Sequence, residues 1–352
     1  MAWISLLFLF LNLEAAELPR LLTKHSLETL RYISLDGRYA YVQKRPGVLG
    51  LVTSFKSIDF LSEPFGNDFL VKSSPYKGRL IIESIPNAHT EMSLFKNHKI
   101  LVVDYGNMVT REIGAGKNAK LYLRDEWISY YNIVDKVIHI ENLITQKKYD
   151  IKLTKKQNPF FIPEVDMISS GTVVYTDINE NGFAALVSYD LLSLKSTIIY
   201  KSSQSSTRLE LCRDEGLLAL GEFPFDGVSR GSKIQTISVT DFMNLAGFTT
   251  VYSSVEKDIG NMVCHQGNIY FIKTVNHDEV LNVKVTEAVK LELKGLNVKL
   301  LSNLKHVTQL IEMDGRILIP LRGEFFVVEG QANLSIDTLK SNPEKEELEI
   351  DL

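Results

Sequence analysis

The stretch CRDEGLLALG (residues 212–221) contains a pattern that recurs along this 352-residue chain. A short run alternates apolar and polar residues, a tight polar turn follows, and a second alternating run comes after the turn. Alternation with a period of two is the signature of a β-strand, so each copy predicts a β-hairpin. The other copies are ISLDGRYAYV (33–42), SPYKGRLIIE (74–83), YLRDEWISYY (122–131), MISSGTVVYT (167–176), CHQGNIYFIK (264–273) and IEMDGRILIP (311–320).

The spacing of these hairpins is regular. Their turn residues are Gly37, Gly78, Glu126, Gly171, Gly216, Gly267 and Gly315, which lie 41, 48, 45, 45, 51 and 48 residues apart by subtraction. A period of this length leaves room for about four short strands per repeat. We therefore predict an all-β fold of seven four-stranded antiparallel units.

A second series of turn residues supports this division. Asp and Asn accept hydrogen bonds from the backbone two residues on and so stabilise tight turns. We expect each member to follow the third strand of its repeat, as a turn residue and not as a catalytic carboxylate. The series is Asp59, Asp104, Asn142, Asp190, Asp241, Glu287 and Glu329.

The hairpins carry a resemblance to a known architecture. The turns LDG at Asp36 and MDG at Asp314 resemble the SPDG hairpin of bacterial β-propellers, in which an Asp-Gly pair forms a tight turn. Over residues 25–338 the chain resembles the seven-bladed β-propellers of the TolB, YVTN and WD-repeat superfamilies. Trp-Asp dipeptides are absent, so the resemblance implies the seven-bladed propeller fold and no functional subfamily.

The ends of the chain differ from the repeats. Residues 3–13 are an uncharged apolar run followed by small residues, which predicts a signal peptide over 1–16 and an exported, secreted or periplasmic, protein. An N-terminal anchor or a buried helix is the alternative. We expect one propeller domain over 17–340 and no stable membrane span after signal cleavage, because the run is too short. The acidic tail 341–352 predicts a solvated extension, or alternatively a docking peptide for a basic partner.

The charge balance argues against one class of partner. The chain has 39 basic and 43 acidic side chains and a net charge of −4. A nucleic-acid binder would usually show a basic surplus, so no nucleic-acid partner is predicted. The two cysteines, Cys212 and Cys264, lie in the first strands of adjacent repeats, and we expect two buried free thiols because such strands are usually too far apart for a disulfide. One disulfide, formed in an oxidising compartment, is the alternative.

Loops between the second and third strands are the candidate binding region, because they gather on one face of a propeller. The most suggestive loop is EFPFDGVSRGSK (222–233), in which Phe223 and Phe225 would stand exposed beside Asp226 and Arg230. The alternative is that one phenylalanine belongs to the core and that Asp226 forms a turn. His277 and Asp278 are further binding candidates, with surface positions as the alternative.

A metal site is only weakly indicated. The segment DINENG (177–182) matches the first half of a calcium loop through Asp177, Asn179 and Asn181, but position twelve is Ser188 and not an acid. A hairpin loop without metal is therefore preferred. No catalytic motif or phosphate-binding loop is present, so neither a catalytic residue nor a cofactor is predicted.

Two functions remain open at this point. The favoured one is an exported noncatalytic protein that binds a protein, peptide or glycan partner through its loop face. The alternative is an enzyme, such as a lactonase, lyase or cyclotransferase-like hydrolase, with acids or histidine at the same face. Its candidate residues are Asp177, Glu180, Asp226, His277 and Asp278.

Overall fold

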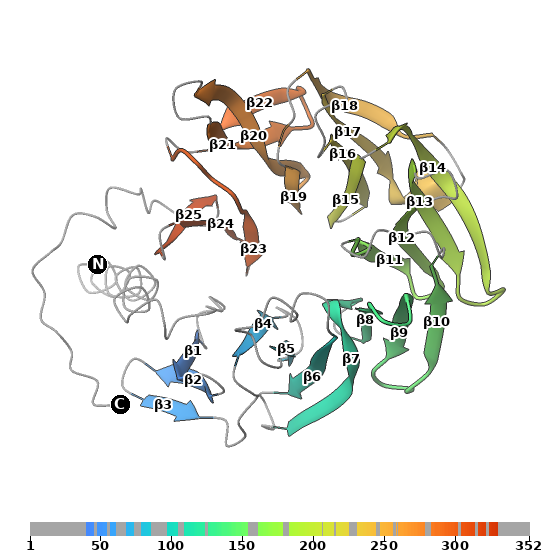
Figure 1. Cartoon of the computed structure of the whole chain (residues 1–352), viewed down its shortest axis with the longest axis vertical. Coiled ribbons are helices and arrows are strands. Elements are labelled where there is room, and N and C mark those ends of the chain that lie inside the picture. The colour runs from blue at the N-terminus through green and yellow to red at the C-terminus, as the bar shows by residue number, and fades with distance from the viewer. Residues whose placement is uncertain are drawn as a thin grey trace, which may run out of the picture. The chain divides into compact units, whose positions relative to one another are not determined.

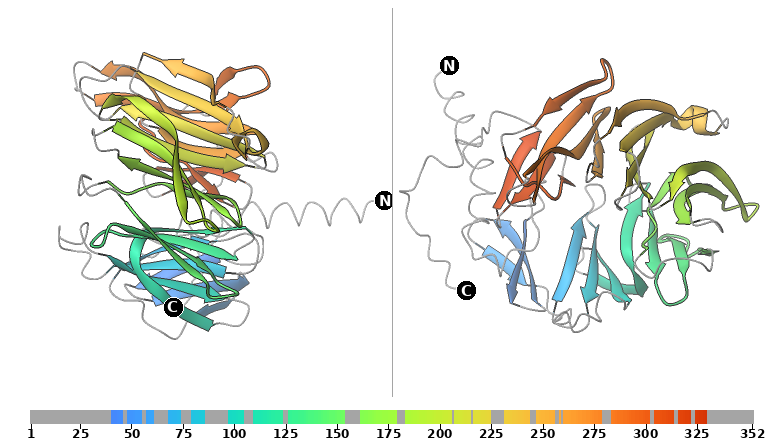
Figure 2. Two further views of the ribbon diagram at one scale, coloured as in Figure 1. Left: turned by 90° about the vertical axis from the view of Figure 1, so that its right-hand side faces the viewer. Right: turned by 45° about the horizontal axis from the view of Figure 1, so that its top comes forward.

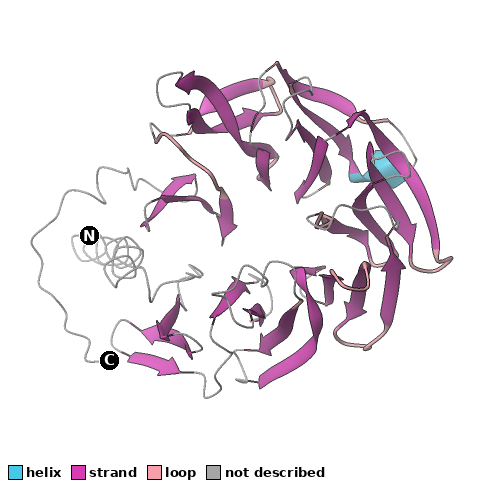
Figure 3. Cartoon of the chain, in the orientation of Figure 1, coloured by secondary structure: helices cyan, strands magenta, loops and turns pink. Residues whose placement is uncertain are grey.

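The computed structural model describes a chain built almost entirely of β-strands (Figure 3). The residues it describes are 40–45, 48–54, 57–60, 68–73, 79–85, 97–104, 109–123, 126–153, 161–178, 183–205, 207–214, 216–224, 231–243, 247–255, 258, 260–278, 283–301, 304–313, 316–321 and 324–329. The predicted signal peptide and acidic tail lie outside these residues. The chain divides into two compact units, which we describe separately.

Unit 1 holds three groups of strands (Figure 2). The strands in each group are hydrogen-bonded to one another in chain order. They are β1 (Ala40–Arg45), β2 (Val48–Ser54) and β3 (Ser57–Phe60); β4 (Asp68–Ser73), β5 (Arg79–Ile85) and β6 (His98–Asp104); and β24 (Arg316–Leu321) with β25 (Glu324–Glu329). Two strands pass from one unit to the other, β7 (Val109–Tyr122) and β23 (Ile311–Met313).

Unit 2 holds four successive antiparallel groups (Figure 1). The first consists of the end of β7 with β8 (Trp127–Asn132), β9 (Val137–Asn142) and β10 (Lys148–Lys152). Three four-stranded sheets follow: β11 (Val165–Ser169), β12 (Thr172–Ile178), β13 (Phe183–Asp190) and β14 (Lys195–Ser205); β15 (Thr207–Asp214), β16 (Leu217–Pro224), β17 (Ser232–Ser238) and β18 (Thr249–Ser254), with helix α2 (Val239–Met243); and β19 (Gly260–His265), β20 (Asn268–Asp278), β21 (Val283–Glu292) and β22 (Asn297–Leu300).

The core of unit 2 lies between neighbouring sheets. Strand β19 shows the cause, because its side chains alternate between buried and partly exposed along all six residues. Each sheet therefore offers an apolar face to the next one. One cluster joins Trp127 to Leu191, a second joins Ile168 to Phe242, and a third joins Phe223 to Phe271.

The predicted first hairpins are confirmed at four positions in unit 2. Glu126 joins β7 to β8, Gly171 joins β11 to β12, Gly216 joins β15 to β16, and Gly267 joins β19 to β20. Gly216 and Gly267 have φ values of 73° and 70°, a region that favours glycine. Gly37, Gly78 and Gly315 lie outside the described residues. The number of seven blades stays a prediction.

The second turn series is confirmed at Asn142 and Asp190, whereas Asp59 lies inside β3 and Asp241 lies in helix α2. The amides of Ile144 and Thr145 donate to Asn142 Oδ1 at 3.0 and 2.7 Å, and those of Leu192 and Ser193 donate to Asp190 Oδ1 at 2.9 and 2.6 Å. The prediction is wrong for Glu287, because β21 continues through this residue to Glu292.

The two turn series are joined to each other by backbone hydrogen bonds. The N–H of Leu143 donates to the carbonyl of Glu126 at 2.7 Å, and the N–H of Leu191 donates to the carbonyl of Gly171 at 2.8 Å. Both kinds of turn therefore lie at one end of their sheet, which we call the turn end. The second and third strands are connected at the opposite end, which we call the loop end.

Only one helix occurs among the residues described, the five-residue α2. Within the same residues, no helix is long and apolar enough to cross a membrane.

Candidate functional site

The first strands of the sheets in unit 2 carry a group of ion pairs. Strands β11, β15 and β19 lie along one side of the unit, and the fourth strands lie along the other (Figure 1). Six charged side chains on or next to β7, β11 and β15 form what we call the first-strand charged cluster. They are Lys120, Glu164, Asp166, Arg208, Glu210 and Arg213.

Lys120 and Glu164 connect β7 to the start of β11. Lys120 Nζ lies 3.0 Å from Glu164 Oε2, and the hydroxyl of Tyr122 donates to the carbonyl of Val165 at 2.8 Å. Burial acts to lower the pKa of Lys120, but the charges of Glu164 and Asp166 act with Tyr122 to hold that pKa above its usual value. The lysine is therefore charged when the protein is folded.

Asp166 and Arg213 connect β11 to β15. Arg213 Nε lies 3.0 Å from Asp166 Oδ1, and the carboxylate is mostly buried. Burial raises the pKa of Asp166 above its ordinary value, and the charges of Arg213 and Lys120 oppose this rise. The arginine thus limits the cost of holding a carboxylate in the interior.

Arg208 and Glu210 lie near the loop end of β15. Glu210 is bound by Arg208 and also accepts a hydrogen bond from the N–H of Met262 at 2.9 Å. Burial raises the pKa of Glu210, the Arg208 charge lowers it, and the charge of Glu164 adds to the rise. The side chain of Arg208 is 53% exposed, so it is the cation of the cluster most open to solvent.

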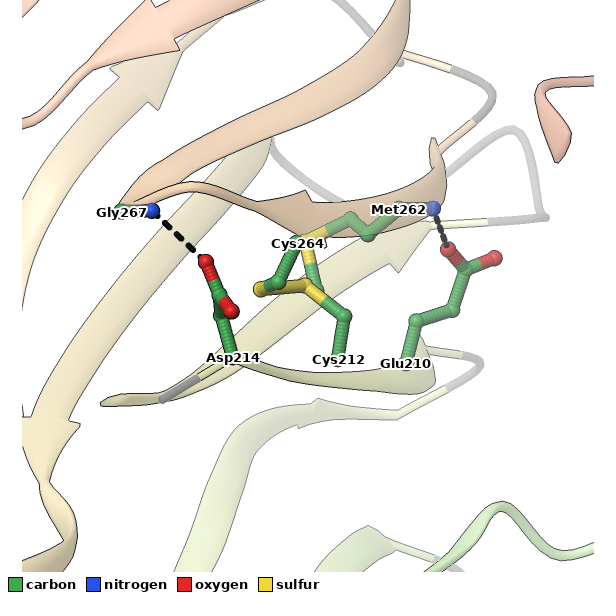
Figure 4. Close-up of a disulfide and its surroundings, with 6 residues drawn as sticks. All are labelled: Glu210, Cys212, Asp214, Met262, Cys264 and Gly267. Carbon is green, nitrogen blue, oxygen red and sulfur yellow. Dashed lines mark hydrogen bonds between the residues drawn. A yellow bond between two sulfur atoms is a disulfide. The ribbon is translucent and has the colours of Figure 1, made fainter. Parts of the chain in front are cut away.

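Strands β15 and β19 are joined covalently. Cys212 and Cys264 form a disulfide with their Cα atoms 5.3 Å apart (Figure 4). On either side of it, Glu210 binds the Met262 amide and Asp214 Oδ2 accepts from the Gly267 amide at 2.6 Å. The prediction of two free thiols is wrong, because these contacts bring the first strands of the two sheets within disulfide distance.

Phe223 is not an exposed anchor, so this part of the sequence prediction is wrong. Its side chain is only 2% exposed and packs with Met262 and Phe271 in the core between two sheets. The cause is strand alternation, because β16 continues to Pro224 and Phe223 faces the next sheet. The alternative interpretation, that one phenylalanine belongs to the core, is the one observed.

The remaining loop candidates are placed only in part. Phe225, Asp226, Arg230, Asn179, Glu180 and Asn181 lie outside the described residues. Asp177, the residue before the last one of β12, has a buried side chain whose Oδ1 accepts a hydrogen bond from the Ile178 amide at 2.7 Å. His277 and Asp278 belong to β20 and not to a loop, and their strand partners are Lys284 and Val283.

The first-strand charged cluster was not predicted, because the binding candidates in the sequence lie in expected loops and the cluster lies on strands. A signal for it exists in the strands before each turn, where Asp166, Glu210 and Arg213 place charged residues in segments that the alternation predicts to be strands. The pairing of these charges crosses from one repeat to another, and spacing along the chain does not reveal which residues meet.

The chemistry of the cluster is that of a neutral network. It has three carboxylates and three cations, and every carboxylate contacts a cation. Such a network can exchange an internal partner for a charged group of a ligand, most easily at the exposed Arg208. Within the described part of the chain, no three His, Cys, Asp or Glu side chains are grouped as a metal site.

Comparisons with solved structures identify the fold. The propeller domain of the Trilobed protease from Pyrococcus furiosus has a TM-score of 0.52 at 12% identity, over 83% of this chain and 93% of that one. A prolyl endopeptidase has a TM-score of 0.53 at 10% identity, over 84% of this chain and 43% of that one. TolB from Acinetobacter baumannii has a TM-score of 0.44 at 12% identity, over 77% of this chain and 61% of that one.

No family model and no curated protein matches the chain. At these identities the structural likeness concerns the fold alone. Together with the four-stranded antiparallel sheets, it shows that the chain has the β-propeller fold, as the hairpin repeat predicts.

Proposed function

We propose that this protein is an exported β-propeller that binds a protein, peptide or glycan partner at the loop end of its sheets and does not catalyse a reaction. The observation that carries the proposal is the first-strand charged cluster. Its carboxylates are each held by a cation, and Glu210 also by a backbone N–H. A general base needs a carboxylate that is able to take up a proton from its substrate, whereas recognition of a charged partner needs placed and partly exposed charges.

The export part of the proposal is supported by the disulfide. Disulfides form and persist in oxidising compartments and are rare in the cytosol. The Cys212–Cys264 bond is consistent with passage through such a compartment, as the apolar run at 3–13 also predicts.

The partner part is tested by charge removal at the loop end. Wild-type protein, Arg208→Ala and Lys299→Ala would be immobilised and compared for partner recovery from secreted and envelope extracts and from a glycan array. Lys299 is a matched control, because it also pairs with a carboxylate, Glu292, but on the outermost strand pair of another sheet. We expect recovery by Arg208→Ala to fall about tenfold and recovery by the control to be unchanged. Equal recovery by all three, with equal thermal stability, would contradict a loop-end site at Arg208.

An enzyme is the second candidate, and two observations favour it. Burial raises the pKa values of Asp166 and Glu210, and carboxyl groups with raised pKa values occur at many catalytic sites. A panel of lactones, uronate oligosaccharides and cyclisable peptides would be tested for turnover with wild-type protein and Glu210→Gln. Turnover that the Glu210→Gln variant loses would replace the binding proposal with a catalytic one.

A further inference from the structure

The turn between β13 and β14 exposes a group of large aliphatic side chains. Leu192 is 82% exposed, Leu194 is 60% exposed, and Ile198, at the start of the edge strand β14, is 56% exposed. Single exposed aliphatic residues are common on protein surfaces. Three within seven residues of one hairpin tip form a local apolar projection, which in a soluble protein often marks a contact surface.

Hydrogen bonds and a buried leucine fix the backbone of this turn. Asp190 Oδ1 accepts from the amides of Leu192 and Ser193, and Leu191 is buried against the neighbouring sheet. Leu194 has a φ of 56°, a left-handed conformation that is uncommon for a bulky residue. Asp190 and Leu191 thus fix the turn on the core, while Leu192 and Leu194 remain exposed.

The neighbouring sheet repeats this arrangement. In the turn between β9 and β10, Asn142 Oδ1 binds the amides of Ile144 and Thr145, Leu143 is buried, and Ile144 is exposed. Both turns are at the turn end of their sheets, and the two ends are adjacent because Leu191 packs in one core cluster with Trp127. We call these two turns the apolar turn pair, and their exposed aliphatic residues are Ile144, Leu192, Leu194 and Ile198.

An exposed lysine lies at each tip. Lys147 is three residues after Ile144, and Lys195 directly follows Leu194. Glu141 is buried and pairs with Lys148 at 3.0 Å, whereas Asp190 is an exposed carboxylate that binds the amides of its own turn and lies opposite Lys195 in the strand register. The tips therefore combine projecting aliphatic side chains with lysines.

We infer that the apolar turn pair docks on the surface of an anionic lipid bilayer. Aliphatic side chains on narrow projecting turns can enter the boundary between headgroups and acyl chains, which deforms around them and needs no complementary pocket. Lysines beside them are attracted to anionic headgroups. The docked protein would have its loop end directed away from the bilayer, because the loop end is the opposite end of the same sheets.

Sedimentation with lipid vesicles tests the inference. Purified protein would be mixed with vesicles of phosphatidylcholine alone and of phosphatidylcholine with phosphatidylglycerol, and the bound fraction measured over a range of salt concentrations. We expect binding to the anionic vesicles to be at least about tenfold stronger and to weaken as salt rises.

Amino-acid substitutions test whether the apolar turn pair makes the contact with the bilayer. The double variant Leu192→Ser/Leu194→Ser should reduce binding to anionic vesicles about tenfold, since it removes two inserted aliphatic side chains. Lys147→Glu/Lys195→Glu should reduce it and also flatten its salt dependence. The matched control is Val134→Ser, which removes an aliphatic side chain that is 72% exposed in the turn between β8 and β9 at the loop end. Binding by this control should equal that of the wild type.

Several outcomes would overturn the inference. Wild-type protein that binds neither kind of vesicle has no lipid-docking surface. Binding that survives Leu192→Ser/Leu194→Ser, or that Val134→Ser also loses, is not made by the apolar turn pair. Self-association that the leucine variant abolishes, without vesicle binding by the wild type, would assign the surface to a second copy of the chain.

Discussion

The ring of Phe223 lies so close to Gly221 that a Cβ atom on Gly221 would stand 2.3 Å from Phe223 Cε2. The two residues are on the same face of β16, and the ring covers the glycine where a side chain would otherwise pack. Gly260, at the start of β19, lies against the same ring, with a corresponding distance of 2.6 Å to Cδ2. Glycines on two neighbouring sheets thus make the space that buries the phenylalanine.

The first prediction concerns this space. Gly221→Ala should destabilise the protein by about 1–3 kcal/mol, because the added methyl group forces the Phe223 ring out of a packed core. Gly171→Ala is the control, since a Cβ there would meet no atom within 4 Å. Denaturant unfolding should place the control within about 0.5 kcal/mol of the wild type. Equal free energies of unfolding for the two variants would contradict the packing described.

The second prediction concerns the disulfide. Cys212→Ser/Cys264→Ser should lower the free energy of unfolding by about 2–4 kcal/mol, because the bond closes a long loop in the unfolded chain. The two cysteines are 52 residues apart. Wild-type protein unfolded with a reductant present should match the double variant. A wild-type protein that loses no stability on reduction would show that the bond does not constrain unfolding.

The third prediction concerns pH. The pKa of Glu210 is raised in the folded protein above its ordinary value of 4.5, so the folded state holds this proton more tightly than the unfolded state. The contribution of Glu210 to stability is therefore fully present below that value and is lost as pH rises through the folded pKa. Glu210→Gln keeps an oxygen for the Met262 amide and removes the titration.

Unfolding curves of wild-type protein and Glu210→Gln measured from pH 4 upward should show this difference. The stability of the wild type relative to the variant should fall with rising pH. A difference that is constant over this range would mean that the pKa of Glu210 is not raised by folding.

The fourth prediction concerns export. When the complete chain is expressed in a cell with a secretory pathway, the mature protein should lack residues 1–16, because the apolar run at 3–13 directs cleavage after it. Intact mass measurement gives the new N-terminus. Alkylation of the unreduced mature protein should modify neither cysteine, and after reduction it should modify both. A full-length product with two reactive thiols would contradict export.

The fold could be predicted from the sequence because it depends on local signals. Gly171 and Gly216 lie in turns between alternating strands, and Asn142 and Asp190 form turns with their own side chains. Each of these features depends on residues that are neighbours in the sequence. The extent of a strand was harder to predict. Because β16 continues to Pro224, Phe223 lies in a strand and is buried. Because β20 continues to Asp278, His277 lies in a strand and not in a loop.

The candidate site could not be predicted in the same way. Asp166 meets Arg213 and Cys212 meets Cys264 only because separate repeats are placed side by side. Distances between repeats depend on how sheets pack and not on spacing along the chain. Lys120 and Glu164 illustrate this, since 44 positions separate them in sequence while their charged atoms are 3.0 Å apart.

The hydrogen bonds that join the two turn series affect where this protein can tolerate inserted residues. The carbonyls of Glu126, Gly171 and Gly216 each accept a hydrogen bond from a backbone N–H. In each case the donor is the residue that follows the third strand of the same sheet. A residue added to such a hairpin would separate the two partners of this hydrogen bond. The connection between β8 and β9 at the loop end is held in the same way, because the N–H of Leu153 donates to the carbonyl of Lys136 at 3.0 Å. Hairpins held by such bonds should tolerate insertions poorly, so new recognition loops are best grafted at connections that lack them.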